Sequence, residues 1–427
     1  MTRPAAQGPR DLTEVVPGTR VETPDGTCYV VSCEYPVTYR YGGGPLEEAR
    51  STAGATLAAL ARDEGLSGLT LDRACFLDTE TTGLAGGTGT HVFLVGLGAF
   101  EGDFFRVEQF FMEDYDREPA LLSALEERLH AFEAVVTFNG KAFDLPLIET
   151  RFILSRRRPP LRERPHLDLL AASRRLWGLR LESCRLAALE EAVLGESRVG
   201  DVPGWLVPQH YFAYLRTQDA WYLRPVFEHN RLDVLSLLAL TGQAARRFES
   251  FLTRPPGEDD LDPLDLLALA RLYRSVGFLE PAVRCYEACL GAGPAEEVDR
   301  VGLELIRLLR RLRRTHEAMA VATRLADGYP PRVWALVELS KDLEHRLRDY
   351  DRALAVVDRA LGLLTEVPGS ALPGGPARPS ARPPVREDSL LPALEWRRDR
   401  LLRRRRGGAG SERPGGRARQ PAPRPWS

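Results

Sequence analysis

Apolar residues along the chain follow two patterns, one typical of strands and one typical of helices. Short apolar runs rich in β-branched and aromatic residues predict strands over residues 74–78, 91–100 and 104–112. Helical spacing follows over LLSALEERLHAF, and the run AVVTFNG predicts one more strand. Strands that alternate with helices predict an α/β fold, which we expect over residues 71–250.

The segment before this domain carries a hairpin signal. Residues 1–16 are polar and are expected to be disordered. Asp25 and Gly26 separate two β-rich runs, and this dipeptide is typical of a tight turn between paired strands. We therefore expect a small N-terminal β-unit with its lead-in over residues 17–70.

Helical spacing dominates from about residue 166 to 245, and residues 251–263 have the composition of a linker. Beyond the linker the pattern is one of paired helices, in which Ala282, Ala318 and Ala353 recur at spacings of 36 and 35 residues. This pattern resembles about three degenerate tetratricopeptide-like units over residues 264–365. A generic helical bundle is the alternative. The repeats could recruit a protein partner.

The end of the chain, residues 366–427, is rich in proline, glycine and arginine. Such a segment buries little apolar surface, so a mostly disordered tail is expected. From Arg397 onward it holds eleven arginines against two acids, a charge that could hold phosphates or could be merely solvated.

Composition sets the outer limits of these expectations. With 427 residues, 44% of them apolar, the chain is large enough for two folded domains. The net charge of −2 favours no class of partner, and the six scattered cysteines lack zinc-ligand spacing. The sequence has no signal-peptide pattern and no membrane-spanning apolar run, which predicts a cytoplasmic protein without a membrane partner.

Three short segments carry acidic residues in positions suited to a site. FLDTETTG places Asp78 and Glu80 two residues apart at the end of an apolar strand, on one side of the sheet. In VVTFNGKAFD a buried strand ends and a helix opens near Asp144. In PVFEHNRLD, His229 and Asp233 lie four residues apart and therefore on one face of a helix.

Each segment taken alone also has an ordinary structural explanation. Acids spaced like Asp78 and Glu80 often only face water, and Asp144 would be favourable at a helix N-terminus. The pair formed by His229 and Asp233 could be a surface contact. The three segments together are more informative, because four converging carboxylates repel one another by about 4 kcal/mol per pair at 4 Å and an effective dielectric near 20.

Such a cluster requires cations. Mg²⁺ prefers oxygen ligands and phosphates, and two divalent ions can activate water and stabilise the leaving oxygen in phosphodiester cleavage. A histidine beside the cluster could orient or deprotonate that water.

The motifs DTETTG, NGKAFD and HNRLD, in this order, resemble the three exonuclease motifs of the DEDD (DnaQ-like) superfamily. Within it, the N-terminal β-segment, the stretch LAGGTGTHVFLVG and the trailing helices are similar to the YprB-type ribonuclease H-like proteins. The resemblance implies a mixed ribonuclease H-like sheet flanked by helices, followed by an all-α tetratricopeptide-like domain. It departs at His229, because histidine-type members usually carry the histidine five residues before the final aspartate, not four.

By this resemblance the catalytic residues are His229 and the metal ligands, which would hold two divalent ions, Mg²⁺ or Mn²⁺. The implied metal ligands are Asp78, Glu80, Asp144 and Asp233. The residues expected near the substrate are Thr82, Gly83, Asn139, Lys141 and Phe143.

The function implied is a 3′–5′ exonuclease that hydrolyses single-stranded DNA or RNA. A non-hydrolytic binding or scaffold protein and a structure-selective endonuclease are the alternatives. Two further features stay open at this point. Asp168 could support the site or cap a helix, and the aromatic residues Tyr211, Phe212, Tyr214 and Trp221 could stack unpaired bases, although core packing is favoured.

Overall fold

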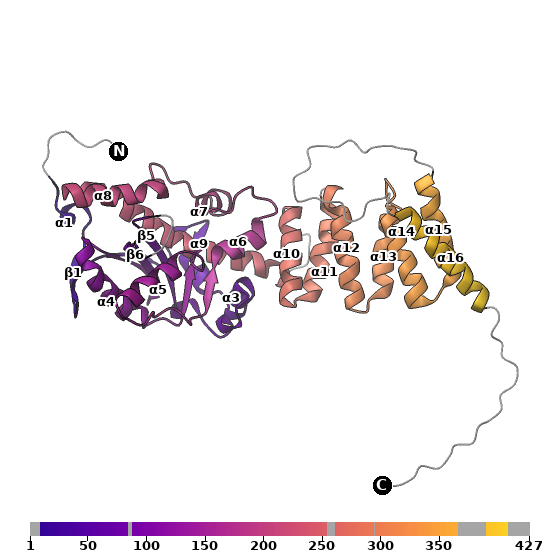
Figure 1. Cartoon of the computed structure of the whole chain (residues 1–427), viewed down its shortest axis with the longest axis horizontal. Helices are drawn as coiled ribbons and strands as arrows, with labels where there is room; N and C mark the ends of the chain where they lie inside the picture. Colours follow the sequence, from indigo (N-terminus) through magenta and orange to yellow (C-terminus); the bar gives the residue numbers. More distant parts are fainter. Residues whose placement is uncertain (1–8, 84–87, 254–260, 294, 366–389, 409–427) are drawn as a thin grey trace, which may run out of the picture. The chain divides into compact units, whose positions relative to one another are not determined.

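The computed structural model describes residues 9–83, 88–253, 261–293, 295–365 and 390–408 (Figure 1). The chain divides into two compact units, residues 1–285 and 286–427, and each is described by itself. None of the helices in the described ranges is both long and apolar enough to cross a membrane.

A seven-stranded mixed sheet forms the centre of the first unit, with the strand order β1-β2-β7-β6-β5-β8-β9. Neighbouring strands from β1 to β5 are antiparallel, whereas β5, β8 and β9 are parallel. The strands are β1 (Thr19–Thr23), β2 (Gly26–Pro36), β5 (Ala74–Thr81), β6 (Val92–Glu101), β7 (Phe104–Phe111), β8 (Ala134–Thr137) and β9 (His166–Asp168). A separate two-stranded ribbon consists of β3 (Arg40–Tyr41) and β4 (Gly44–Pro45).

Helices flank this sheet, as the alternation of patterns predicts. The longest of them is α9 (Arg224–Thr253), which packs on β5, β6 and β7, while α4 (Glu118–Leu129) packs on β2 and β7. The first unit also contains α1 (Leu12–Val15), α2 (Leu46–Arg50), α3 (Gly54–Ala61), α5 (Asp144–Leu154), α6 (Leu169–Trp177), α7 (Leu186–Leu189), α8 (Val207–Thr217) and α10 (Pro263–Val276), and the last of these packs on α6. The nearly continuous apolar run of β6 is buried along its length, as expected for a central strand covered on both faces. The predicted ribonuclease H-like fold is therefore confirmed.

The N-terminal β-hairpin differs from its expected place. The predicted turn is present, since Thr23 pairs with Gly26 at the end of β1 and β2. However, β2 also pairs with β7 along eight residues, from Tyr29 opposite Phe111 to Pro36 opposite Phe104. The hairpin thus extends the main sheet and is not a separate unit, because a long-range pairing that local sequence does not reveal unites them.

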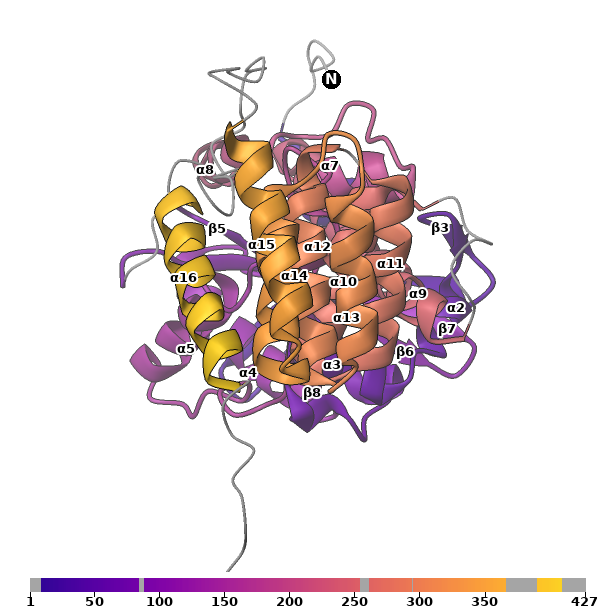
Figure 2. The same ribbon diagram turned by 90° about the vertical axis from the view of Figure 1, so that its right-hand side faces the viewer.

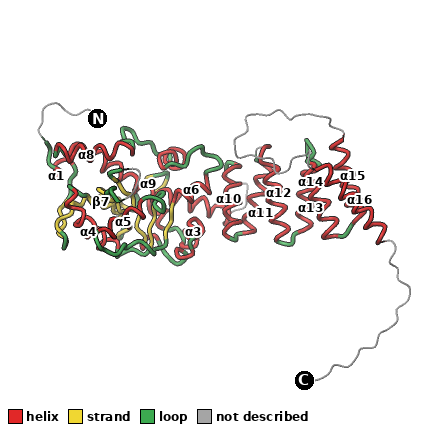
Figure 3. The backbone as a smooth tube through the Cα atoms, in the orientation of Figure 1, coloured by secondary structure: helices red, strands yellow, loops and turns green. Residues whose placement is uncertain are grey.

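The described part of the second unit consists of helices and turns (Figure 3). The helix α11 (Leu279–Ala292) crosses the boundary between the units. The others are α12 (Ala295–Arg311), α13 (Thr315–Ala326), α14 (Val333–Asp342), α15 (Tyr350–Thr365) and α16 (Leu390–Gly408). Consecutive helices from α12 to α16 pack on one another. The recurring small residues Ala282, Ala318 and Ala353 are fully buried on α11, α13 and α15, which explains why the pattern repeats.

The tail also differs from its expectation, because part of it is the helix α16. This helix lies along α15 (Figure 2), and its Leu394 and Leu401 are buried. The fully buried Glu344 accepts hydrogen bonds from Arg397 at 2.7 Å and from Arg400 at 2.5 Å. Arginines that composition alone assigns to a solvated tail are therefore used in folding, since they neutralise a buried carboxylate. The rest of the expected tail lies outside the described residues.

Candidate functional site

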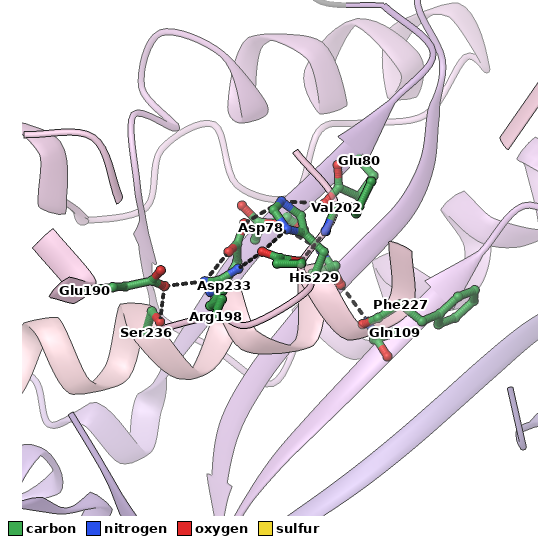
Figure 4. A network of polar contacts seen from close by, with 12 residues as sticks. Asp78, Glu80, Gln109, Glu190, Arg198, Val202, Phe227, His229, Asp233 and Ser236 are labelled. Carbon is green, nitrogen blue, oxygen red and sulfur yellow. Dashed lines mark hydrogen bonds and ion pairs between the residues drawn. The ribbon is translucent and has the colours of Figure 1, made fainter. Parts of the chain in front are cut away.

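The acidic residues of the first unit converge where β5 meets α9. Asp78 and Glu80 come from β5, and His229 and Asp233 come from one face of α9 (Figure 4). Ligand atoms of Glu80, His229 and Asp233 all lie within 4.8 Å of one another. The Nε2 atom of His229 lies 4.0 Å from a carboxylate oxygen of Glu80 and 3.5 Å from one of Asp233.

Asp78 is held by an amide of α9. The fully buried Asn230 donates from Nδ2 to Oδ2 of Asp78 at 2.9 Å, and its Oδ1 accepts a hydrogen bond from Gln109 at 2.9 Å. Asp78 pairs with Gly96 in the sheet register, and Gly96 pairs with Gln109. Because Gly96 has no side chain, Asn230 can lie directly on the sheet between the two polar residues.

The remaining predicted carboxylate, Asp144, is the first residue of α5 and is buried. Its Oδ1 accepts a hydrogen bond from the hydroxyl of Thr79 at 2.5 Å. A carboxylate at a helix N-terminus also gains from the helix dipole. Its charge is close enough to raise the pKa values of Asp78 and Glu80.

Burial and mutual repulsion disfavour the charged forms of these carboxylates. Burial raises the pKa of Glu80 to about 8, with contributions from Asp233 and Asp144, and it raises the pKa of Asp144 to about 6. The pKa of Asp78 is raised for the same reason, burial first and then the neighbouring acids. Divalent cations would offset this repulsion, so the donor set fits a hard metal ion that prefers oxygen ligands.

A loop residue that the sequence motifs do not include, Asp201, orients His229. Its Oδ2 lies 2.8 Å from Nδ1 of the imidazole, which leaves Nε2 to face Glu80 and Asp233. Burial lowers the pKa of His229, but the hydrogen bond to Asp201 and the charges of Asp233 and Glu80 outweigh it and raise the pKa to about 9.

The same loop contributes a cation, Arg198. Its guanidinium lies 2.5 Å from Oδ1 of Asp233 and 3.2 Å from Oδ2 of Asp201, and it also pairs with Glu190. The hydroxyl of Ser236 donates to Glu190 at 2.5 Å and so completes this network. Sequence reasoning missed Arg198 and Asp201, because a loop has no periodicity. Their only local signal is a pair of opposite charges three residues apart in a glycine-containing segment.

The predicted substrate residues lie on two segments beside the acids. The backbone amides of Asn139 and Lys141 donate to the carboxylate of Asp168 at 2.9 and 3.2 Å, while their side chains are exposed. Asp168 also accepts from the amide of Leu170, so it both caps α6 and holds the loop that leads to Asp144. Phe143, just before α5, is half-buried.

The other two substrate candidates, Thr82 and Gly83, follow β5. The hydroxyl of Thr82 accepts from the amide of His91, and the carbonyl of Gly83 accepts from Thr81. These bonds shape the turn after the DTETTG motif.

The aromatic patch of the sequence divides between core and surface. Tyr211 is fully buried and stacks on Phe93 with ring centroids 4.1 Å apart, and Tyr214 is buried beside it. Core packing therefore explains these two residues. Phe212 points outward, with 40% of its surface exposed, and Trp221 is half-buried.

Comparison with known proteins gives two matches. A model of the RNase_H superfamily matches residues 75–245, a range that contains Asp78, Glu80, Asp144, His229 and Asp233. The chain is also 31% identical over 346 residues to the protein named "Uncharacterized protein YprB" of Bacillus subtilis (strain 168). That match covers 79% of this chain and 81% of the relative.

Proposed function

The chain belongs to the RNase H superfamily and to the family of YprB, and from this premise we propose that it is a metal-dependent 3′–5′ exonuclease of the DEDD type. Its substrate would be single-stranded DNA or RNA. The superfamily match supports a nucleic-acid-processing hydrolase with a divalent metal in general. The polarity and the two-metal mechanism rest on the resemblance of the three motifs.

The observation that carries the proposal is the convergence of buried and half-buried carboxylates from three segments. Glu80 and Asp233 approach the same imidazole. Burial and the nearby charge of Asp144 raise the pKa of Glu80, and the pKa values of Asp78 and Asp144 are raised as well. A protein that only binds nucleic acid gains nothing from a cluster whose members repel one another. In a cluster that binds cations, and through them phosphates, every carboxylate can serve as a ligand.

In this proposal the metal ligands are Asp78, Glu80, Asp144 and Asp233. Two divalent ions bound there would supply Lewis-acid activation of the water and stabilisation of the leaving oxygen. Asn230 and Thr79 fix the directions of Asp78 and Asp144 through their hydrogen bonds. His229 would accept a proton from the attacking water at Nε2, the nitrogen that faces the acids.

The exposed side chains of Asn139 and Lys141, with Phe143, Thr82 and Gly83, are proposed to contact the terminal nucleotide. The loop that carries Asn139 and Lys141 is held by two hydrogen bonds from its backbone amides to the carboxylate of Asp168. For residues 264–365 we propose tetratricopeptide-like repeats that recruit a protein partner. This rests on the spacing and complete burial of Ala282, Ala318 and Ala353.

The proposal is tested with the Asp78→Asn variant of the full chain. The substitution keeps the side-chain volume but removes a ligand charge, so metal-dependent hydrolysis should fall by about a hundredfold or more. The assay follows 5′-labelled single-stranded DNA and RNA with Mn²⁺, Mg²⁺ or EDTA. Products that shorten one nucleotide at a time from the 3′ end are expected.

Asp72→Asn is the matched control, because Asp72 is an exposed carboxylate six residues earlier that pairs with Arg50. This variant should cleave like the wild-type chain. Cleavage of circular single strands would indicate an endonuclease instead. No cleavage by the wild-type chain with any metal would favour the binding or scaffold alternative.

A further inference from the structure

One face of the segment that leads into and along α8 presents large side chains to solvent. The four residues Trp205, Gln209, Phe212 and Arg216, which we call the α8 strip, are all exposed. They follow one another at spacings of four, three and four residues, so they lie in one row along the helical segment. Trp205 has 61% of its surface exposed and Phe212 has 40%.

The opposite face of this segment does the packing. Val207, Tyr211 and Tyr214 are buried in the core of the first unit. Because these residues already anchor α8, Trp205 and Phe212 are not needed for its stability. Large exposed aromatic residues in a row on a helix are typical of a binding surface.

The strip begins beside the proposed catalytic histidine. A Cβ atom placed on Gly204, the residue before Trp205, would lie 4.0 Å from Nε2 of His229 and would meet no other heavy atom within 4 Å. Three residues earlier, Asp201 contacts Nδ1 of the same ring at 2.8 Å. The backbone from Asp201 to Gly204 therefore runs along the imidazole and leads to Trp205.

We propose that the α8 strip is the track on which unpaired bases of a single-stranded nucleic acid stack as the strand leads to the acidic cluster. Trp205 would hold the base nearest the site and Phe212 a later one, about 10 Å further along at a rise of 1.5 Å per residue. Arg216 would contact a phosphate beyond them. The proposal rests on the nuclease function proposed above and adds the surface that would bind its single-stranded substrate.

Aromatic rings bind the faces of bases without regard to sequence. In a duplex those faces are covered by neighbouring base pairs, so an aromatic row selects unpaired strands of either DNA or RNA. Arg216 adds attraction for the backbone, which every strand carries. The strip thus selects a single strand in preference to a duplex, whichever sugar it contains.

The test measures binding separately from cleavage. A fluorescein-labelled oligothymidylate, an abasic oligonucleotide of equal length and a blunt duplex are titrated with the full chain in Mg²⁺, on an Asp78→Asn background that does not consume the probe. Trp205→Ala should raise the Kd for oligothymidylate about five- to hundredfold. Trp205→Phe should restore most of the affinity, and Kd for the abasic strand should not change.

Phe104→Ala is the control, because Phe104 is similarly exposed but lies away from the site on β7. It is five residues, or about 17 Å along the strand, from Gln109, which contacts Asn230 beside the acidic cluster. An unchanged Kd for oligothymidylate in Trp205→Ala and Phe212→Ala, or equal losses for the abasic strand, would overturn the track. Cleavage by chains with Asp78 intact is assayed beside this. Base-dependent binding without cleavage would refute the nuclease function and support the α8 strip as a binding track. Cleavage with a normal KM in Trp205→Ala would support the nuclease function and refute the track.

Discussion

Asp201 determines which nitrogen of His229 faces the acidic cluster. With Nδ1 bonded to Asp201 at 2.8 Å, Nε2 is directed at Glu80 and Asp233. The four-residue spacing from His229 to Asp233, which departs from the usual histidine-type motif, places the two side chains on adjacent turns of α9. The position of the ring therefore depends on a loop residue as well as on the motif.

Asp201→Asn should lower kcat by about tenfold to a hundredfold with little change in KM, because the imidazole loses the partner that fixes its tautomer. The hydrogen bond to Asp201 is the largest of the effects that raise the pKa of His229. Its loss should lower that pKa, so the acidic limb of the pH–rate profile should move to lower pH. Steady-state kinetics on a labelled single strand across pH measure both effects.

Glu228→Gln is the control for this variant, since Glu228 is an acid on the same helix that pairs with Arg231. It should leave kcat and the pH–rate profile unchanged. If Asp201→Asn cleaves at the wild-type rate at every pH, Asp201 does not position the histidine.

At the scale of elements, β6 and α9 lie in close contact at Gly96. A Cβ atom on Gly96 would lie 2.3 Å from Oδ1 of Asn230 and 2.9 Å from its Nδ2, the atom that donates to Asp78. Glycine in the interior of a strand often marks such an approach. The close contact brings Asn230 between Asp78 and Gln109.

Gly96→Ala should displace Asn230 and so release Asp78. We expect a loss of about 1–3 kcal/mol in the free energy of unfolding from overpacking. Cleavage should fall more than this loss of stability explains, because a metal ligand loses its support. Thermal unfolding measures the loss of stability. The cleavage rate is measured at a temperature below the unfolding transition of both proteins.

Gly68→Ala is the matched control, because a Cβ atom there meets nothing within 4 Å and its backbone is not in the left-handed region. Its stability and activity should match those of the wild-type chain. A Gly96→Ala variant that behaves in the same way would show that the contact of Asn230 with the sheet is dispensable.

Elements with strong local patterns could be predicted from the sequence. The apolar run before Asp78 predicts β5, and the helical spacing around Asp233 predicts α9, because burial selects the same residue types at these periods. The repeat of alanines predicts the paired helices of residues 264–365. In each case the information lies within one element and its neighbours in the chain.

What depends on long-range contacts could not be predicted. The pairing of β2 with β7 joins residues about seventy to eighty positions apart, and nothing near Tyr29 specifies it. Arg198 meets Asp233 only because the chain folds back over α9. The helix α16 could not be predicted, because its many arginines are evident in the composition but the buried Glu344 that they neutralise is not.

At the scale of the whole molecule, the acidic cluster opposes folding unless protons or cations reduce its charge. Glu80, Asp144 and His229 all have pKa values raised above the ordinary ones, to about 8, 6 and 9. Between the ordinary and the raised values the folded chain binds more protons than the unfolded chain. Raising the pH through this window therefore lowers the free energy of unfolding.

We expect the melting temperature of the first unit in EDTA to fall by several degrees from about pH 5 to about pH 9, as these groups lose protons. Saturating Mn²⁺ should raise it more at high pH than at low pH, because carboxylates bind the ion only when ionised. Calorimetry of the wild-type chain and of Glu80→Gln measures this, and the variant should show a smaller fall and a smaller gain from Mn²⁺. A gain from Mn²⁺ of equal size at every pH, or unaffected by Glu80→Gln, would mean that the ion binds away from the cluster, because protons and metal would then not compete for the same oxygens.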